Sequence, residues 1–169
     1  MHILRTRFKK DIVAEFLPAL SWSKGRRPKR VNEAKNAKVI ILCGGMPGTP
    51  RHRGLVEFWA KKNYWTFYPR YRGSWESGGI FLKLSPEQDV LDIVDELPKG
   101  FEYMTVGGIR TVGEMKKFKI RPSAIYVVGG SFGGPATILA SRDPRITKAI
   151  AISPVVEWRA SSKAEPLNW

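Results

Sequence analysis

Apolar residues occur along the chain in short runs whose spacing alternates between that of strands and that of helices. Two continuous runs rich in β-branched residues, 38–42 and 124–128, are typical of strands covered on both faces. Other apolar runs predict the remaining strands: 1–8 and 12–17, which suit a leading β-hairpin, and 64–68 and 146–153. The pattern therefore predicts six strands, the first two of them adjacent.

Helix signals fall between these strands. Helices are predicted at 54–62, 86–97 and 135–142. The second of them begins with Ser85 as a capping residue and has a glutamine three positions later, as a capping box requires. Its Asp89 and Asp92 fall opposite the apolar face, so we expect both to face solvent. Segment 114–119 is a candidate for a short basic helix, and 101–113 gives no clear pattern.

Strands that alternate with helices indicate the α/β class, with a mostly parallel sheet and helices on both of its faces. The 169 residues suit a single domain, 1–169, with room for a substantial core. Within it, 1–37 holds the leading hairpin and a basic loop, and 38–158 holds the core strand and helix units.

Composition excludes several classes of protein. No apolar run approaches the roughly 20 residues of a membrane-spanning helix, and the first residues lack the apolar stretch of a signal peptide. We therefore expect a cytoplasmic protein that does not bind membranes. Cys43 is the only cysteine, which excludes an intrachain disulfide and a zinc site built from cysteine pairs. We expect neither a metal nor a cofactor.

The net charge of +14 raises the question of an anionic partner. Residues 1–38 hold 11 Lys and Arg against 3 Asp and Glu, so the excess of positive charge is concentrated at the start of the chain. Segment 24–30 mixes these charges with glycine and proline, which is typical of a solvated loop, and no nucleic-acid-binding motif accompanies it. A nucleic-acid partner is therefore not expected. A polyanion-binding module that uses the basic loop 24–38 stays as an alternative.

A G-x-S-x-G motif, residues 129–133, lies between the clearest buried strand and a helix. This context suits a sharp turn that exposes the hydroxyl of Ser131 at the carboxyl edge of the sheet, with Gly129 and Gly133 letting the chain segments pass closely. The backbone N–H of Phe132 would point toward the same space and could stabilise an oxyanion. The run fits neither glycine-rich phosphate-binding template. An anion-binding turn and a turn without chemistry stay as alternatives.

Five segments follow one another in an informative order. They are the glycine loop 43–48, the Tyr-Pro-Arg-Tyr-Arg-Gly-Ser segment 68–74, the helix 86–97, the serine turn 129–134, and the strand and loop 150–158. In this order they resemble the α/β-hydrolases, and most closely the amino-terminal part of the catalytic domain in prolyl oligopeptidase-like serine peptidases. The resemblance implies that the serine turn carries the nucleophile and that the glycine loop provides part of an oxyanion hole.

The glycine loop departs from the family pattern at two positions. Cys43 stands where the family has histidine, and Met46 separates the glycines from the proline. The resemblance makes the N–H of Gly45 the first choice for the second oxyanion donor, and that of Met46 the next.

In the α/β-hydrolases the catalytic triad follows the chain order nucleophile, acid, histidine, and the residues after Ser131 do not complete it. No histidine follows this serine, and the sequence ends just past the sixth predicted strand, so the expectation is an α/β-hydrolase fold truncated there. His52 is an alternative base, although the arginines on either side of it suggest a solvent-facing loop. Cys43 with His52 is an alternative thiol pair.

The sequence therefore predicts a serine hydrolase, either a peptidase or an acyl-ester hydrolase, that forms an acyl-enzyme on Ser131 from a peptide or ester substrate. These 169 residues alone are expected to be inactive. A catalytically inactive interaction domain of the same fold is an alternative. Arg70 and Arg72 are expected to be exposed or ion-paired. The alternative is that they anchor a substrate carboxylate or the structure near the site.

Overall fold

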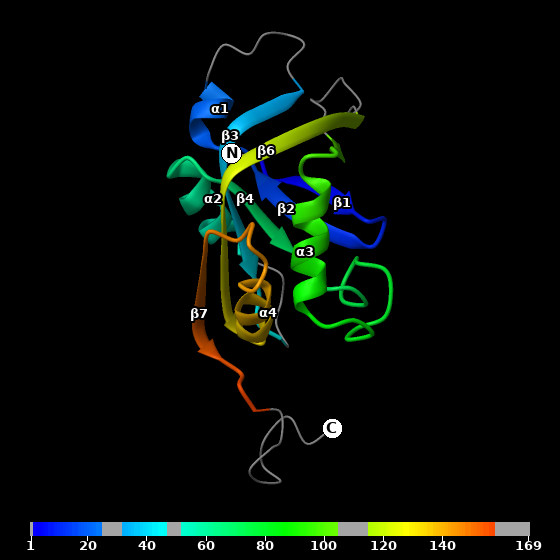
Figure 1. Ribbon diagram of the computed structural model, residues 1–169. Coiled ribbons are helices and arrows are strands. Elements are labelled where there is room, and N and C mark those ends of the chain that lie inside the picture. The colour runs from blue at the N-terminus through cyan, green and yellow to red at the C-terminus, as the bar shows by residue number, and fades with distance from the viewer. Residues whose placement is uncertain (1, 25–31, 47–51, 105–114, 158–169) are drawn as a thin grey trace.

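The computed structural model describes residues 2–24, 32–46, 52–104 and 115–157 (Figure 1). The strands are β1 (Leu4–Phe8), β2 (Ile12–Leu17), β3 (Glu33–Cys43), β4 (Trp65–Pro69), β5 (Phe101–Met104), β6 (Met115–Ser131) and β7 (Lys148–Pro154). The helices are α1 (Leu20–Lys24), α2 (Arg53–Lys61), α3 (Glu87–Glu96) and α4 (Gly133–Ala140). The leading hairpin and the three predicted helices are confirmed, whereas α1 and β5 are additions to the predicted set.

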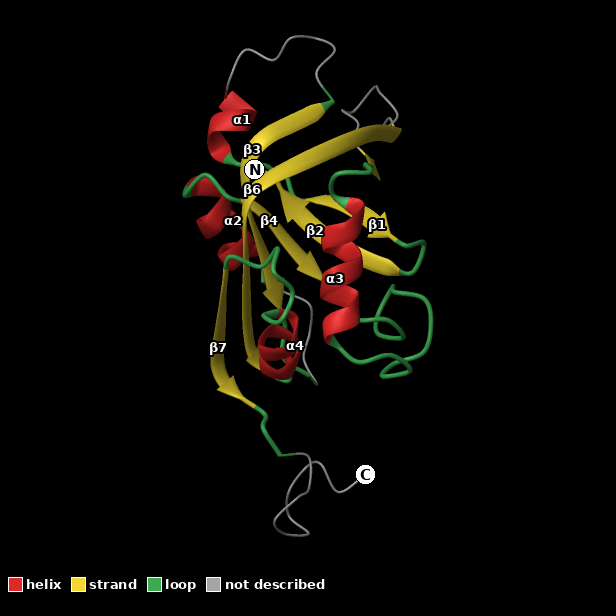
Figure 2. Cartoon of the chain, in the orientation of Figure 1, coloured by secondary structure: helices red, strands yellow, loops and turns green. Residues whose placement is uncertain are grey.

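All seven strands belong to one mixed sheet (Figure 2). β4, β3, β6 and β7 run parallel to one another. β1 and β2 are antiparallel to each other, β2 is antiparallel to β4, and β5 is antiparallel to both β1 and β6. The expectation of a mostly parallel sheet is therefore corrected. The leading hairpin lies between β4 and β5, and the two strands of a hairpin necessarily run in opposite directions.

β6 is long enough to pair with three other strands. Its first residues pair with β5, residues 119–129 pair with β3, and residues 126–131 pair with β7. The sheet thereby curls into a barrel-like form with β7 at its edge. The basic helix expected at 114–119 is instead the start of this strand. Phe118 and Ile120 are buried while the lysines beside them are exposed, which is the two-residue period of a strand.

Helices cover both faces of the sheet, as predicted. α3 and α4 lie over one face (Figure 1), where Ile93 and Ala136 join the larger apolar cluster. α2 lies over the other face, where Val56 and Ala60 join a smaller cluster. None of the described helices is long and apolar enough to cross a membrane.

The expectation of a basic loop over 24–38 is corrected for residues 33–38. Residues 33–38 belong to β3, because they pair with β6 and because Ala34 and Ala37 are buried. Residues 25–31 lie outside the described part of the chain.

Candidate active site

Ser131 is the last residue of β6 and directly precedes the turn into α4. Its φ is +51°, in the left-handed region that residues with a side chain rarely adopt. Its carbonyl accepts a hydrogen bond of 3.1 Å from the N–H of Val155, and the residue is exposed. The chain therefore holds this serine in a strained conformation at the carboxyl edge of the sheet, between β6 and α4.

The glycines on either side of Ser131 lie where three chain segments meet. A Cβ atom at Gly129 would collide with the carbonyl of Gly133 and the hydroxyl of Thr137. A Cβ atom at Gly133 would collide with the carbonyl of Cys43. β6, α4 and the end of β3 thus approach one another more closely than any side chain would permit.

The described part of the glycine loop, residues 43–46, passes beside Ser131. A Cβ built on Gly45 would lie 3.3 Å from the Cβ of Ser131 and 3.8 Å from its Oγ. The Tyr71 hydroxyl donates a 3.1 Å hydrogen bond to the carbonyl of Gly44 and so holds the loop in place. Met46 packs against the larger core. The loop that the resemblance assigns to the oxyanion site is therefore adjacent to the serine, with Gly45 directly beside it.

Phe132 links the serine turn to the loop that follows β4. Its ring is buried, with the ring of Tyr71 edge-on at 5.0 Å and that of Phe81 stacked at 5.5 Å between centroids. Phe132 directly precedes the first residue of α4, so its backbone N–H lies at the start of that helix. The G-x-S-x-G motif predicts Phe132 at this turn, and Tyr71 lies in the segment 68–74 of the sequence resemblance. No local sequence pattern indicates that Phe81 packs here.

Two small hollows lie near the serine turn. One is lined by Gly45, Met46 and Trp75, and the other by Phe81, Leu82 and Phe132 among others. Trp75 and Leu82 are more than half exposed. The surface near the serine is therefore partly apolar.

Asp89 and Asp92 are buried, which corrects the expectation that they face solvent. The guanidinium of Arg72 donates hydrogen bonds to both carboxylates, with Nη2 2.6 Å from Oδ2 of Asp92. The backbone N–H of Arg72 also donates to Oδ2 of Asp89, at 2.8 Å. Burial raises the pKa of Asp89, and the bonds from Arg72 oppose that rise. The helical period assigned these aspartates correctly to the polar face of α3, but that face meets Arg72 rather than water.

Arg70 is also buried and ion-paired. Its Nη2 lies 3.0 Å from Glu15 and its Nε 2.7 Å from Glu76. Arg5 reaches the same two carboxylates, at 3.2 and 3.3 Å. Both arginines of segment 68–74 are therefore ion-paired, one of the roles that the sequence allowed them.

Cys43 and His52 do not form a thiol pair. Cys43 is buried at the end of β3, and burial raises the pKa of its thiol to about 12, so the reactive thiolate is absent at neutral pH. His52 is exposed at the start of α2, with its ring 4.8 Å from that of Tyr68. Among interactions between described residues, none joins His52 to Ser131 or to Cys43. The described residues also contain no cluster of His, Cys, Asp and Glu suited to a metal.

Known structures share this architecture. An esterase from Pyrococcus furiosus superposes with a TM-score of 0.59 at 16% identity, over 93% of this chain and 50% of its own. A candidate α/β hydrolase of unknown function from Agrobacterium tumefaciens gives 0.56 at 18% identity, over 88% and 60%. A predicted CIB-like hydrolase from Thermoplasma acidophilum gives 0.56 at 16% identity, over 90% and 64%. No protein-family model and no curated protein matches the chain.

These similarities establish the fold class. The chain has the α/β architecture of hydrolases and esterases. It spans between half and about two thirds of the length of these three proteins.

Proposed function

We propose that the protein is a serine hydrolase that acts through an acyl-enzyme on Ser131. The observation that carries the proposal is the backbone of this residue, whose φ of +51° places an exposed hydroxyl at the junction of β6 and α4. Strain of this kind costs on the order of 1–3 kcal/mol and persists where the surrounding structure enforces it. The close packing at Gly129 and Gly133 provides that enforcement.

In the proposed reaction, Ser131 Oγ bonds to the carbonyl carbon of the substrate while its proton passes to a base. The carbonyl oxygen becomes an oxyanion that accepts hydrogen bonds from the N–H of Phe132 and from that of Gly45, or Met46 as the next choice. The tetrahedral intermediate then expels the alcohol or amine, which takes up a proton, and water hydrolyses the acyl-enzyme by the reverse sequence.

The base is proposed to lie outside residues 1–169. No histidine follows Ser131 in the sequence, and the ring of His52 packs against Tyr68. The chain also spans only part of the length of its structural neighbours. The 169 residues would then carry the nucleophile and the oxyanion donors but not the complete triad.

The substrate is proposed to be an ester or peptide with an apolar group beside the scissile bond. The exposed Trp75 and Leu82, in the two hollows near the serine turn, would contact such a group. The likeness to an esterase from Pyrococcus furiosus supports the ester, and the resemblance of segments 43–48 and 68–74 to prolyl oligopeptidase-like peptidases supports the peptide.

Labelling with a fluorophosphonate probe tests this proposal in the full-length protein. We expect one probe on Ser131, located by peptide mass spectrometry, and no label or turnover in Ser131→Ala. Ser141→Ala, which removes another exposed hydroxyl, should label normally. Equal labelling of Ser131→Ala would place the reactive group elsewhere. A folded wild-type protein that neither labels nor hydrolyses activated esters would favour the inactive interaction domain.

A further inference from the structure

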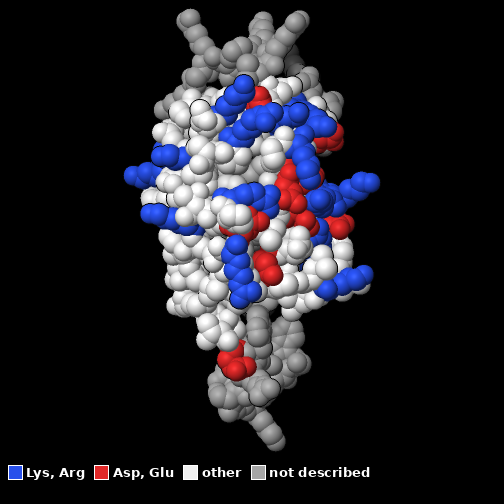
Figure 3. All heavy atoms as spheres, in the orientation of Figure 1, with Lys and Arg blue, Asp and Glu red and all other residues white. Residues whose placement is uncertain are grey.

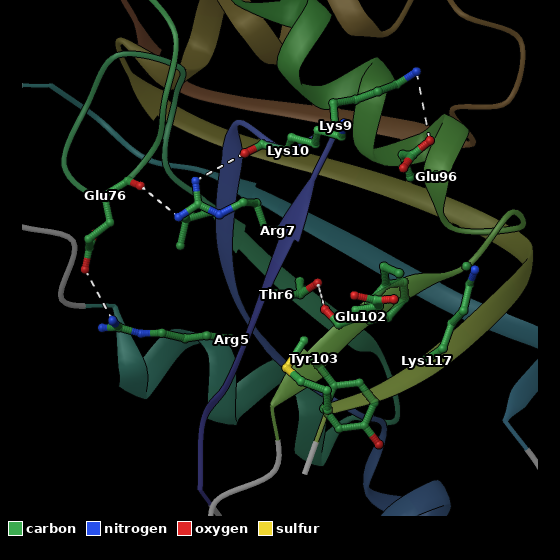
Figure 4. Close-up of a pocket in the computed structure, with 14 residues that line it drawn as sticks. Arg5, Thr6, Arg7, Lys9, Lys10, Glu76, Glu96, Glu102, Tyr103 and Lys117 are labelled. Atoms are coloured by element: carbon green, nitrogen blue, oxygen red, sulfur yellow. Dashed lines mark hydrogen bonds and ion pairs between the residues drawn. The ribbon is translucent and has the colours of Figure 1, made fainter. Parts of the chain in front are cut away.

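A larger hollow lies at the opposite end of β6 from Ser131. It has a volume of about 840 Å³ and is formed by β1, the turn after it, β5, the end of α3 and the first residues of β6 (Figure 4). This volume is within the range of sites that hold small ligands or a few residues of a peptide. Nothing in the proposed hydrolase mechanism uses this part of the molecule.

Positive charge predominates in the lining of this hollow. The basic residues are Arg5, Arg7, Lys9, Lys10 and Lys117, and the acidic residues are Glu76, Glu96 and Glu102. Arg5 pairs with Glu76 at 3.3 Å, and Lys9 lies 3.9 Å from Glu96. Two of the five cations are therefore already neutralised.

The other three cations lack a carboxylate partner within the described residues. The guanidinium of Arg7 donates to the backbone carbonyls of Lys10 and Glu76, at 3.2 and 3.4 Å (Figure 4). These bonds orient the guanidinium without cancelling its charge. Lys10 and Lys117 form no ion pair with a described residue. Although Glu102 lies opposite Lys117 in the register of β5 and β6, the hollow thus presents three positive charges that form no ion pair with a described residue.

The positive surface continues along β6. A neighbouring hollow of about 400 Å³ shares Lys117 and adds Lys119 and Arg121, of which Arg121 pairs with Glu33 at 2.6 Å. Figure 3 shows basic side chains across the upper part of the molecule, where the first half of β6 lies in Figure 1, with acidic ones between them. The two hollows together form what we call the β6 groove.

We propose that the β6 groove binds an acidic peptide segment of a partner protein. Cations without an ion-pair partner attract an anionic ligand. The carboxylates between them disfavour a nucleic acid, whose evenly spaced phosphates would face Glu102 and Glu76. A peptide places acidic side chains only where cations lie. Its apolar side chains can contact Met115, which is 59% exposed, and Tyr103. The partner is therefore a segment in which Asp or Glu alternates with apolar residues.

Fluorescence anisotropy tests the proposal with the protein as it is, since no catalysis is needed. The probe is a short fluorescein-labelled peptide that alternates Glu with Leu, titrated at low salt and at about 0.15 M salt. We expect saturable binding that the triple variant Arg7→Gln/Lys10→Gln/Lys117→Gln weakens about tenfold, since exposed charge pairs each contribute modestly. The variant Lys61→Gln/Lys83→Gln/Lys148→Gln, which removes three exposed lysines outside the groove, should bind like the wild type.

Two matched ligands separate the outcomes. A peptide in which Gln replaces every Glu should bind at least tenfold more weakly than the acidic one. A single-stranded oligonucleotide should also bind more weakly. The proposal is overturned by absence of saturable binding, by tighter binding of the oligonucleotide, or by equal weakening in both triple variants, which would indicate attraction by net charge alone. A result in either direction leaves the labelling of Ser131 unaffected.

Discussion

The side chain of Cys43 lies at the end of β3, next to the glycine loop, and its burial controls its chemistry. Because the pKa of the thiol is about 12, we expect iodoacetamide to leave it unmodified in the folded protein at mildly alkaline pH and to alkylate it fully in urea. Mass spectrometry gives an unambiguous answer, as the chain has one cysteine. Equal rates in the folded and unfolded protein would contradict this burial.

The same pKa has a consequence for stability at high pH. The folded value lies above the ordinary thiol value of about 8.5, so folding favours the protonated thiol. The contribution of Cys43 to stability is complete below the ordinary value and declines as the pH rises toward 12. A Cys43→Ala variant should therefore lose less stability than the wild type over that interval, as urea unfolding at a series of pH values would show.

Gly133 gives a second prediction at this scale. In Gly133→Ala the new methyl group would meet the carbonyl carbon and oxygen of Cys43, both of them backbone atoms that cannot move aside cheaply. We expect a loss of about 2 kcal/mol or more in the free energy of unfolding, measured in urea. Gly54→Ala in α2 is the matched control, because no atom lies within 4 Å of its Cβ position. It should be neutral or stabilise by about 0.5–1 kcal/mol.

At the scale of elements, Arg72 joins the loop after β4 to α3. Replacement by Met would leave Asp89 and Asp92 buried without their cation, and we expect a loss of about 3 kcal/mol in unfolding free energy near neutral pH. Burial already raises the pKa of Asp89, and loss of Arg72 would raise it further. A raised folded pKa favours folding at low pH, so the deficit of the variant should shrink as the pH falls.

Two variants check this role of Arg72. The triple variant Arg72→Met/Asp89→Asn/Asp92→Asn removes the charges together and should recover much of the loss. Arg145→Gln breaks an ion pair with Asp143 in which the arginine side chain is 46% exposed, and should cost less than about 1 kcal/mol. A comparable loss in Arg72→Met and Arg145→Gln would show that Arg72 acts as an exposed residue.

Elements with a strong local signal are predictable from the sequence. The apolar runs 38–42 and 124–128 lie in the second halves of β3 and β6. The serine turn is predictable from its glycine-serine motif and its position after a strand. The start of β6 resembles a basic helix because its outward positions are lysines, so its period becomes visible only once Phe118 and Ile120 have a core to face. The burial of Asp89 depends on a partner 17 positions earlier, which helical periodicity does not encode.

At the scale of the whole molecule, β7 is an edge strand with exposed apolar side chains. It pairs with β6 alone, among the described strands, and Ile150 and Ile152 are 52% and 58% exposed. Such an edge readily pairs with another chain. We expect residues 1–169, expressed alone, to hydrolyse no activated ester at an enzymatic rate and to associate in light-scattering measurements.

Substitutions distinguish association through the edge strand β7 from non-specific hydrophobic association. Ile150→Lys/Ile152→Lys should reduce association, because a charge on an edge strand discourages pairing. Ile80→Lys, at an isoleucine that is 63% exposed on a loop, should not. A monodisperse, inactive wild-type fragment would favour a self-sufficient interaction domain, and serine-dependent turnover would require a base within these residues, with His52 the first to replace.

The pairing of β3 with β6 also determines how the chain can fold. Arg121 and Glu33 are joined by a hydrogen bond across 88 positions of sequence. The sheet that runs from β3 through β4, the leading hairpin and β5 to β6 closes only when β3 pairs with β6. During synthesis, β3 leaves the ribosome long before β6 has been made, so one edge of β3 stays unpaired until then. Contacts of such separation slow folding, because a long loop must close before any of them stabilises the chain. Pairing of β6 with β3 is therefore expected to limit the rate of folding, and the nascent chain is most open to mispairing before β6 emerges from the ribosome.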